Sequence, residues 1–235
     1  MKIVFLILII PVIIFVIQTA RIISYGKESK KLVEISKPFS INVNNPNKTI
    51  LIVGDSLGVG VGAALGQSLS ERLRDDYPQA SISNLSTSGA KLIDGVRILD
   101  ELDKSEKYSL IIIQLGANDI TRFTPLNEAK ESLVEILGLA KKHADQVIFL
   151  TSGSVGHAPI FIEPLKSFYS YRSKKFRAAF KVVAKEKKID YVDLYFEKEN
   201  DPFLKDINLF YSKDYFHPSG EGYGIWYKII KEKIK

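Results

Sequence analysis

The sequence predicts an α/β fold built on a parallel sheet that has helices on both faces. Short apolar, β-branched runs alternate five times with segments whose apolar residues recur at helical spacing. The run LIIIQL at 110–115 has no regular alternation of apolar and polar residues, which indicates a strand buried on both faces. The chain of 235 residues, of which 46% are hydrophobic, is long enough for one such domain and a short additional segment.

The expected elements follow one another from residue 49 to the end of the chain. Strands are expected at 49–53, 81–85, 110–115, 147–151 and 189–194. Helices are expected at 64–77, 91–102, 127–143, 167–188 and 219–234. Gly54 follows the first strand, Pro78 follows the first helix, and Ser219 is an N-cap residue for the last helix. Strand–helix units repeated in this order produce crossover connections and therefore a parallel sheet.

A hydrophobic segment precedes this domain. Residues 3–17 form a run of fifteen apolar residues that follows Lys2. A secretory signal core has about 7–15 residues and a membrane-spanning helix about 20, so the run lies between the two. Its apolar residues cover every helix face, which argues against a half-buried helix. Gln18 breaks the small-x-small pattern before Ala20, so we predict an uncleaved membrane anchor at 1–20 rather than a cleaved signal.

Residues 21–48 are expected to be a polar tether, because they contain Pro38, Pro46 and the turn-forming stretch NVNNPN. The side of the membrane is predicted from two opposing signals. A short N-terminal tail favours export of the body, whereas Arg21 and the lysines that follow it favour retention in the cytoplasm. We expect an extracytoplasmic domain, with the cytoplasmic face or a cleaved and secreted protein as alternatives.

Composition excludes several classes of site and partner. The absence of cysteine excludes disulfides, thiolate metal sites and a cysteine nucleophile. Three histidines are too few to favour a multi-histidine metal centre. The formal net charge is +6, but residues 1–47 carry six Lys or Arg and two Glu, so the body is nearly balanced. We therefore expect no nucleic-acid binding.

Polar residues gather where the expected strands end. Ser56 follows the first strand, Gly89 the second and Asn118 the third, while Asp214 and His217 precede the last helix. The carboxyl ends of parallel strands meet at one edge of a sheet, so we expect these residues to converge there. Together they supply a serine with a histidine base, an aspartate that orients the base, and amide donors for an oxyanion. This set predicts acyl transfer through a serine.

Four sequence blocks then resemble the SGNH hydrolase family, the GDSL-type esterases and lipases. The blocks are GDSL at 54–57, the glycine of NLSTSGA at 89, GAND at 116–119 and DYFH at 214–217. Their order and spacing agree with the family, and the resemblance covers about 49–235. It implies a flavodoxin-like three-layer α/β/α sandwich with a five-stranded parallel sheet. It also implies carboxylic ester hydrolysis without a metal or cofactor.

The resemblance implies a role for each of the five residues. Ser56 is the expected nucleophile, His217 its base and Asp214 the residue that orients the base. Gly89 and Asn118 are expected to form the oxyanion hole with the amide of Ser56. The expected substrate is an ester of a small or medium acyl group on a small molecule, a lipid or a glycan, and the expected partner of residues 1–20 is the membrane.

Other functions fit the sequence less well. GDSLG at 54–58 also matches the nucleophile elbow of α/β-hydrolases, but that fold places several strands before its elbow. The glycines at 58–63 mimic a dinucleotide-binding fingerprint, yet no acidic residue ends the second strand. An acyltransferase would use the same serine, and a membrane-tethered binding module would not use it.

Several residues near the predicted site are given structural roles. Asp55 and Asp119 are expected to hold the backbone through hydrogen bonds. His157 is expected to be an exposed loop histidine, with a place in the pocket as the alternative. Four aromatic residues are expected to pack in the core, with the lining of an acyl pocket or lid as the alternative: Phe161, Phe168, Tyr169 and Tyr171.

Overall fold

A single parallel sheet forms the centre of the domain. The computed structural model describes residues 2–235, and their side chains from residue 10 onward. The five strands lie in the order β2-β1-β3-β4-β5, and every neighbouring pair is parallel. Their bounds are Lys48–Gly54 for β1, Ala80–Asn84 for β2, Tyr108–Gln114 for β3, Ala144–Leu150 for β4 and Asp190–Val192 for β5. The predicted fold class is therefore confirmed.

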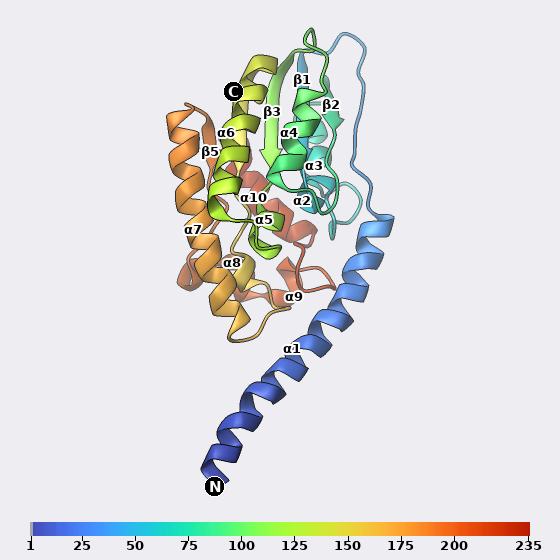
Figure 1. The fold of residues 1–235 in the computed structure, drawn as a ribbon. Coiled ribbons are helices and arrows are strands. Elements are labelled where there is room, and N and C mark those ends of the chain that lie inside the picture. Colours follow the sequence, from blue (N-terminus) through green and yellow to red (C-terminus); the bar gives the residue numbers. More distant parts are fainter. Residues whose placement is uncertain (1) are drawn as a thin grey trace.

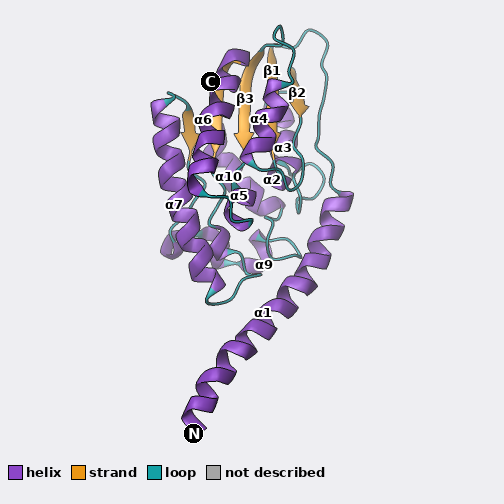
Figure 2. Ribbon diagram, viewed as in Figure 1, coloured by secondary structure: helices purple, strands orange, loops and turns teal. Residues whose placement is uncertain are grey.

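Helices cover both faces of the sheet (Figures 1 and 2). On one face α6 lies between α4 and α7 and contacts both, while α3 and α10 contact each other on the other face. The long helices are α3 (Leu69–Asp76), α4 (Leu92–Asp100), α6 (Leu126–His143), α7 (Leu165–Glu186) and α10 (Gly220–Lys231). Short helices are α2 (Ser56–Val59), α5 (Ala117–Thr121), α8 (Pro202–Lys205) and α9 (Ile207–Phe210), with 3-10 turns η1 (Val155–His157) and η2 (Lys198–Asn200).

The core explains why the central strands show no alternation. Ile52 on β1 and Ile112 on β3 are neighbours in the sheet, and both are completely buried. Helices pack against both faces at this point, so each successive side chain enters apolar surroundings. In the sheet, β2 lies on one side of β1 and β3 lies on the other side of β1. The strand order therefore reverses between β1 and β3, and the crevice at their carboxyl ends is where such sheets place their sites.

The first helix and the last strand of the body are shorter than predicted. The first helix of the body was expected from residue 64, but α3 begins only at Leu69. Gly60, Gly62 and Gly66 all have positive φ and hold residues 60–68 in a loop. Ser68 then caps the helix, because its hydroxyl accepts from the Glu71 amide. The last strand is also shorter than expected, because β5 pairs with β4 through only three residues.

Residues 21–35, the first part of the expected tether, continue helix α1 (Lys2–Ile35). No proline interrupts this stretch before Pro38, and side-chain pairs Lys31–Glu28 and Lys30–Glu34 lie at helical spacing. Residues 36–47 form no helix, and they run beside β2. Ile41 exchanges two backbone hydrogen bonds with Ile82 of that strand.

Helix α1 projects from the body (Figure 1). Within the described residues it is the one helix long and apolar enough to cross a membrane, and its most apolar window is only 6% buried.

Candidate active site

Ser56 stands at the start of α2, where the chain leaves the end of β1. Asp55 caps this short helix: its Oδ1 accepts the Leu57 amide hydrogen at 2.9 Å. Gly54 lets the turn approach the segment after β2, because a Cβ at Gly54 would lie 2.9 Å from Ser86 Oγ. The expected backbone role of Asp55 is therefore confirmed, and the same is true of Asp119, which accepts the Leu92 amide hydrogen at 3.0 Å.

His217 and Asp214 reach Ser56 from the loop before α10. Ser56 Oγ lies 2.9 Å from His217 Nε2, and His217 Nδ1 lies 2.5 Å from Asp214 Oδ2. Because a carboxylate only accepts, we assign the proton to Nδ1, which leaves Nε2 free to accept from the serine hydroxyl. All three side chains are more than nine-tenths buried. The structure thus brings together a hydroxyl, an imidazole and a carboxylate in one chain of hydrogen bonds.

Asp214 also folds the loop that carries it. Its Oδ1 accepts from Ser212 Oγ at 2.7 Å and from the amides of Phe216 and His217 at 3.0 Å each. Tyr215 between them adopts a positive φ of 53°, which turns the chain back on itself. One carboxylate therefore sets both the loop conformation and the imidazole orientation.

The two carboxyl groups beside Ser56 have opposite pKa shifts. Burial alone would raise the pKa of Asp214, but its hydrogen bond with His217, the charge of that ring and the Ser212 hydroxyl outweigh burial and lower it to about 2. Burial raises the pKa of Asp55 to about 6, although the Leu57 amide and His217 act in the other direction. The carboxylate that faces the imidazole is therefore the stable anion of the two.

Asn118 is hydrogen-bonded to the segment that carries Gly89. Gly89 has a φ of +86°, and a Cβ there would meet the Arg122 side chain at 2.9 Å. Asn118 Nδ2 donates to the carbonyl of Ala90 at 3.1 Å and to Asp55 Oδ2 at 3.3 Å. The bond to Asp55 is the longer one, so that hydrogen is the one that an arriving acceptor can capture at least cost.

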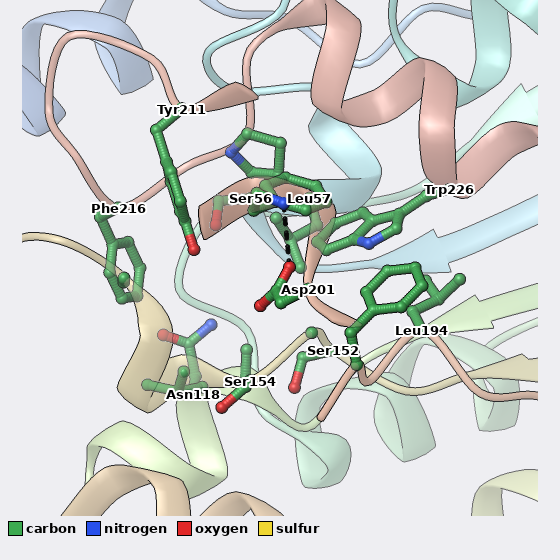
Figure 3. A pocket seen from close by; sticks show the side chains of 17 residues that line it. Ser56, Leu57, Asn118, Ser152, Ser154, Leu194, Asp201, Tyr211, Phe216 and Trp226 are labelled. Carbon is green, nitrogen blue, oxygen red and sulfur yellow. Dashed lines mark hydrogen bonds between the residues drawn. The ribbon is translucent and has the colours of Figure 1, made fainter. Parts of the chain in front are cut away.

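A cavity of about 60 Å³ opens beside Ser56. Figure 3 shows Ser56, Asn118 and Phe216 around it. Its walls are mostly apolar or aromatic, from Leu57, Ala158, Leu194, Phe203, Tyr211, Phe216, Trp226 and others, with Ser152, Ser154 and Asp201 as polar members. The space suits a small apolar group next to the serine. None of the four aromatic residues between 161 and 171 lines it, and Phe168 and Tyr171 are exposed.

A second buried histidine–carboxylate pair adjoins the cavity. The expectation that His157 is exposed is wrong: it is 5% exposed, and its Nδ1 lies 2.6 Å from Asp201 Oδ2. Asp201 also accepts the Phe203 amide hydrogen and lies among the lining residues in Figure 3. The two partners stand 44 residues apart. The sequence gives only one local signal, Asp201 before Pro202 as a helix N-cap.

No metal-binding group of three or more His, Asp or Glu side chains occurs among the residues that the structure describes.

Known proteins resemble this chain in sequence and in fold. Residues 52–225 match the model of the GDSL-like lipase/acylhydrolase family. Esterase TesA of Pseudomonas aeruginosa is 28% identical over 127 residues, which are 52% of this chain and 63% of that protein. The alignment thus spans less than two thirds of this curated relative.

Solved structures share the fold at lower identity. A structure of TesA has a TM-score of 0.62 and 22% identity, and the match covers 80% of this chain and 98% of that one. Esterase EstA of a Pseudoalteromonas species has the same score and identity, with coverages of 80% and 97%. Axe2, an acetylxylan esterase from Geobacillus stearothermophilus, scores 0.62 at 18% identity, with coverages of 82% and 96%.

Proposed function

This chain belongs to the GDSL-like lipase/acylhydrolase family, and we propose that it is a carboxylic ester hydrolase that works through an acyl-serine intermediate on Ser56. The observation that carries the proposal is the continuous hydrogen-bond chain from Ser56 through His217 to Asp214, buried beside a small cavity. Axe2 supports the assignment, since its described catalytic mutants replace a serine, an aspartate and a histidine three residues after that aspartate.

In the first half of the reaction, Ser56 Oγ attacks the ester carbonyl carbon while His217 Nε2 takes the hydroxyl proton. The buried carboxylate of Asp214 holds the imidazole tautomer and stabilises the imidazolium that forms. The tetrahedral intermediate collapses, the protonated His217 gives its proton to the departing alcohol oxygen, and the acyl group stays on Ser56. In the second half, water attacks the acyl carbon, His217 takes the water proton and returns it to Ser56 Oγ, and the acid departs.

The oxyanion of the intermediate needs donors that are already in place. We assign this role to the amides of Ser56 and Gly89 and to the side chain of Asn118. The Asn118 hydrogen now held by Asp55 at 3.3 Å turns to the oxyanion, while the bond to the Ala90 carbonyl keeps the side chain in position. A donor of this kind contributes about 10²–10³ in kcat.

The size of the cavity favours a short acyl group. Its aromatic walls and its room for a few water-sized groups fit an acetyl or similarly small acyl group against Ser56. A long acyl chain would need a larger space along the wall that Phe203, Tyr211 and Trp226 form.

We also assign residues 1–20 to an uncleaved membrane anchor, and we place the enzymatic domain on the extracytoplasmic side of the membrane. Cleavage after Ala20 would remove Gln18, which is 6% exposed and bonds the body through Ile160 and Ile162. A signal peptide destined for removal has no need of such contacts. An alkaline phosphatase fused after the last residue tests the side: activity supports export, and a stable but silent fusion contradicts it.

The serine mechanism is tested with the full chain in detergent. Hydrolysis of p-nitrophenyl esters from acetate to palmitate is measured for the wild type, for Ser56→Ala and for Ser132→Ala, a matched serine on α6 away from the cavity. We expect activity on the shortest esters, its loss in Ser56→Ala, and no change in Ser132→Ala. Activity that survives in Ser56→Ala would refute the assigned nucleophile, and a preference for palmitate would refute the short acyl group.

A further inference from the structure

Helix α1 is joined to the body by an unusual buried amide. Gln18 is the first residue after the apolar run, and it is almost completely buried. Its Nε2 donates to the Ile160 carbonyl at 3.1 Å, and its Oε1 accepts from the Ile162 amide at 2.7 Å. Both halves of the side chain thus pair with one loop of the body. A buried amide satisfied in this way specifies one docking position, because any shift leaves polar atoms without partners.

A second set of contacts extends the joint along the helix. Arg21, one turn after Gln18, donates to the carbonyls of Pro159 and Ile160 and lies over the Tyr25 ring. Tyr25 in turn packs edge-on against Tyr215, with ring centroids 4.9 Å apart. These contacts fall on one face of α1, at the i, i+3 and i+7 positions, so the helix is held along two turns.

The two loops that α1 contacts are the loops that shape the site. Tyr215 lies between Asp214 and the cavity-lining Phe216. The Ile160 amide donates to the Tyr215 carbonyl at 3.0 Å, and Ala158 in the same loop lines the cavity. Helix α1 therefore contacts the two loops that carry these cavity-lining residues.

The length of the apolar segment sets where the contacts of Gln18 and Arg21 lie relative to the bilayer. Exposed apolar side chains continue along α1 past these contacts, at Ile22 and Ile23. The apolar run of residues 3–17 forms about 23 Å of helix at about 1.5 Å per residue, and residues 18–20 bring the length close to the bilayer's hydrocarbon thickness of about 30 Å. Gln18 and Arg21 thus lie near the end of the span, and the loop at 159–162 is held at the level of the lipid headgroups.

Exposed apolar side chains surround the same edge of the body. Each follows the carboxyl end of a different strand: Leu65, Phe123, Phe168 and Leu209, with exposed fractions of 96%, 59%, 40% and 46%. Figure 1 shows the N-terminal half of α1 extending beyond the end of the body that holds α9. Apolar groups at such an edge are costly in water and favourable at a bilayer surface.

We propose that docked α1 holds the Ser56 cavity against the surface of the bilayer that α1 spans, so that the substrate is an ester carried by a molecule resident in that bilayer. The identity of the substrate as an ester rests on the proposed function, whereas the orientation of the body rests on the contacts of α1 alone.

The orientation is tested without any measurement of activity. The chain has no cysteine, so Phe168→Cys and Val182→Cys each give one labelling site for an environment-sensitive fluorophore. Both positions are exposed on α7, and they lie about 21 Å apart along the helix. In vesicles of phosphatidylcholine and phosphatidylglycerol that contain headgroup-labelled nitroxide lipid, we expect strong quenching at 168 and little at 182. Quenching that is equal at both positions, or stronger at 182, would overturn the proposal. Leu209→Cys replaces Phe168→Cys if that variant does not fold.

The consequence for the substrate is tested with two acetate esters in the same vesicles. Hexadecyl acetate resides in the bilayer, and p-nitrophenyl acetate is water-soluble. We expect Gln18→Ala to lower the rate on hexadecyl acetate by about tenfold, because the substrate loses its high effective concentration at the site. The rate on p-nitrophenyl acetate should not change, and Thr19→Ala, on the exposed side of α1, should alter neither rate. Equal hexadecyl acetate rates in the wild type and Gln18→Ala would contradict the inference. A wild type that hydrolyses neither ester would contradict the proposed function, and the quenching result would then decide the orientation.

Discussion

Replacing Asp214 with Asn removes one negative charge and leaves the shape of the site intact. The amide oxygen keeps the place of Oδ1, where three donors converge from Ser212, Phe216 and His217. The amide NH₂ must then occupy the place of Oδ2, which lies 2.5 Å from His217 Nδ1 in the wild type. Two donors cannot face each other at that distance, so the ring takes the tautomer with its proton on Nε2. This tautomer cannot accept the proton of Ser56.

The expected loss follows from the burial of the pair. Breaking a fully buried ion pair costs about 3–5 kcal/mol, which corresponds to about 10²–10⁴ in rate if the loss falls on the transition state. Asp214 is 0% exposed, so no solvent replaces the lost charge, and we expect the upper part of this range, a decrease of about 10³–10⁴ in kcat.

The assay is steady-state hydrolysis of p-nitrophenyl acetate at pH 8, with Ser212→Ala as the matched control. Ser212→Ala removes one of the three hydrogen bonds to Asp214 Oδ1 and leaves the bond to His217, so its loss should stay below about tenfold. An Asp214→Asn variant that folds and keeps a tenth or more of the wild-type kcat would refute the reasoning. Equal losses of kcat in Asp214→Asn and Ser212→Ala would refute it as well.

The same substitution changes the response of stability to acid. The folded-state pKa of Asp214, about 2, lies below its ordinary value of 3.8. Its contribution, roughly 2 kcal/mol, is complete above about pH 4 and is lost as the pH falls toward 2. Urea unfolding between pH 5 and pH 2 should therefore show a smaller decline in Asp214→Asn than in the wild type, and parallel declines would contradict the shift.

Other expected outcomes concern the oxyanion donors, the second carboxyl group and the helix packing. Asn118→Ala should lower kcat by about 10²–10³ with little change in KM; an effect confined to KM would indicate substrate binding instead. Asp55 has a folded-state pKa of about 6, above its ordinary 3.8, so its contribution is present below about pH 4 and lost as the pH rises through 6. The unfolding free energy of the wild type relative to Asp55→Asn should fall by roughly 3 kcal/mol over that interval, and a constant difference would refute this. Gly95→Ala on α4 would place a methyl group on Leu115 Cδ1 and should destabilise the fold by about 1–3 kcal/mol. Gly138→Ala on the facing α6 meets nothing within 4 Å and should stabilise it by about 0.5–1 kcal/mol; similar effects of the two in thermal unfolding would contradict the packing.

The layered architecture was predictable because its signals are local. A strand buried on both faces, such as 110–115, needs an unbroken apolar run, and a helix on its surface needs apolar residues at a period near 3.6. Parallel topology then places every strand end at one edge. The positions of Ser56, Asn118 and His217 near one another therefore follow from chain order and strand direction, without knowledge of any side-chain contact.

Contacts between segments far apart in the chain were decided only by the tertiary structure. His157 and Asp201 stand 44 residues apart, and Gln18 and Ile160 stand 142 apart, so no periodicity connects them. Whether a polar side chain is exposed or buried with a partner depends on what the rest of the chain packs against it. The sequence could therefore specify an apolar anchor and a polar segment after it, while the docking of that anchor beside the site emerged from packing alone.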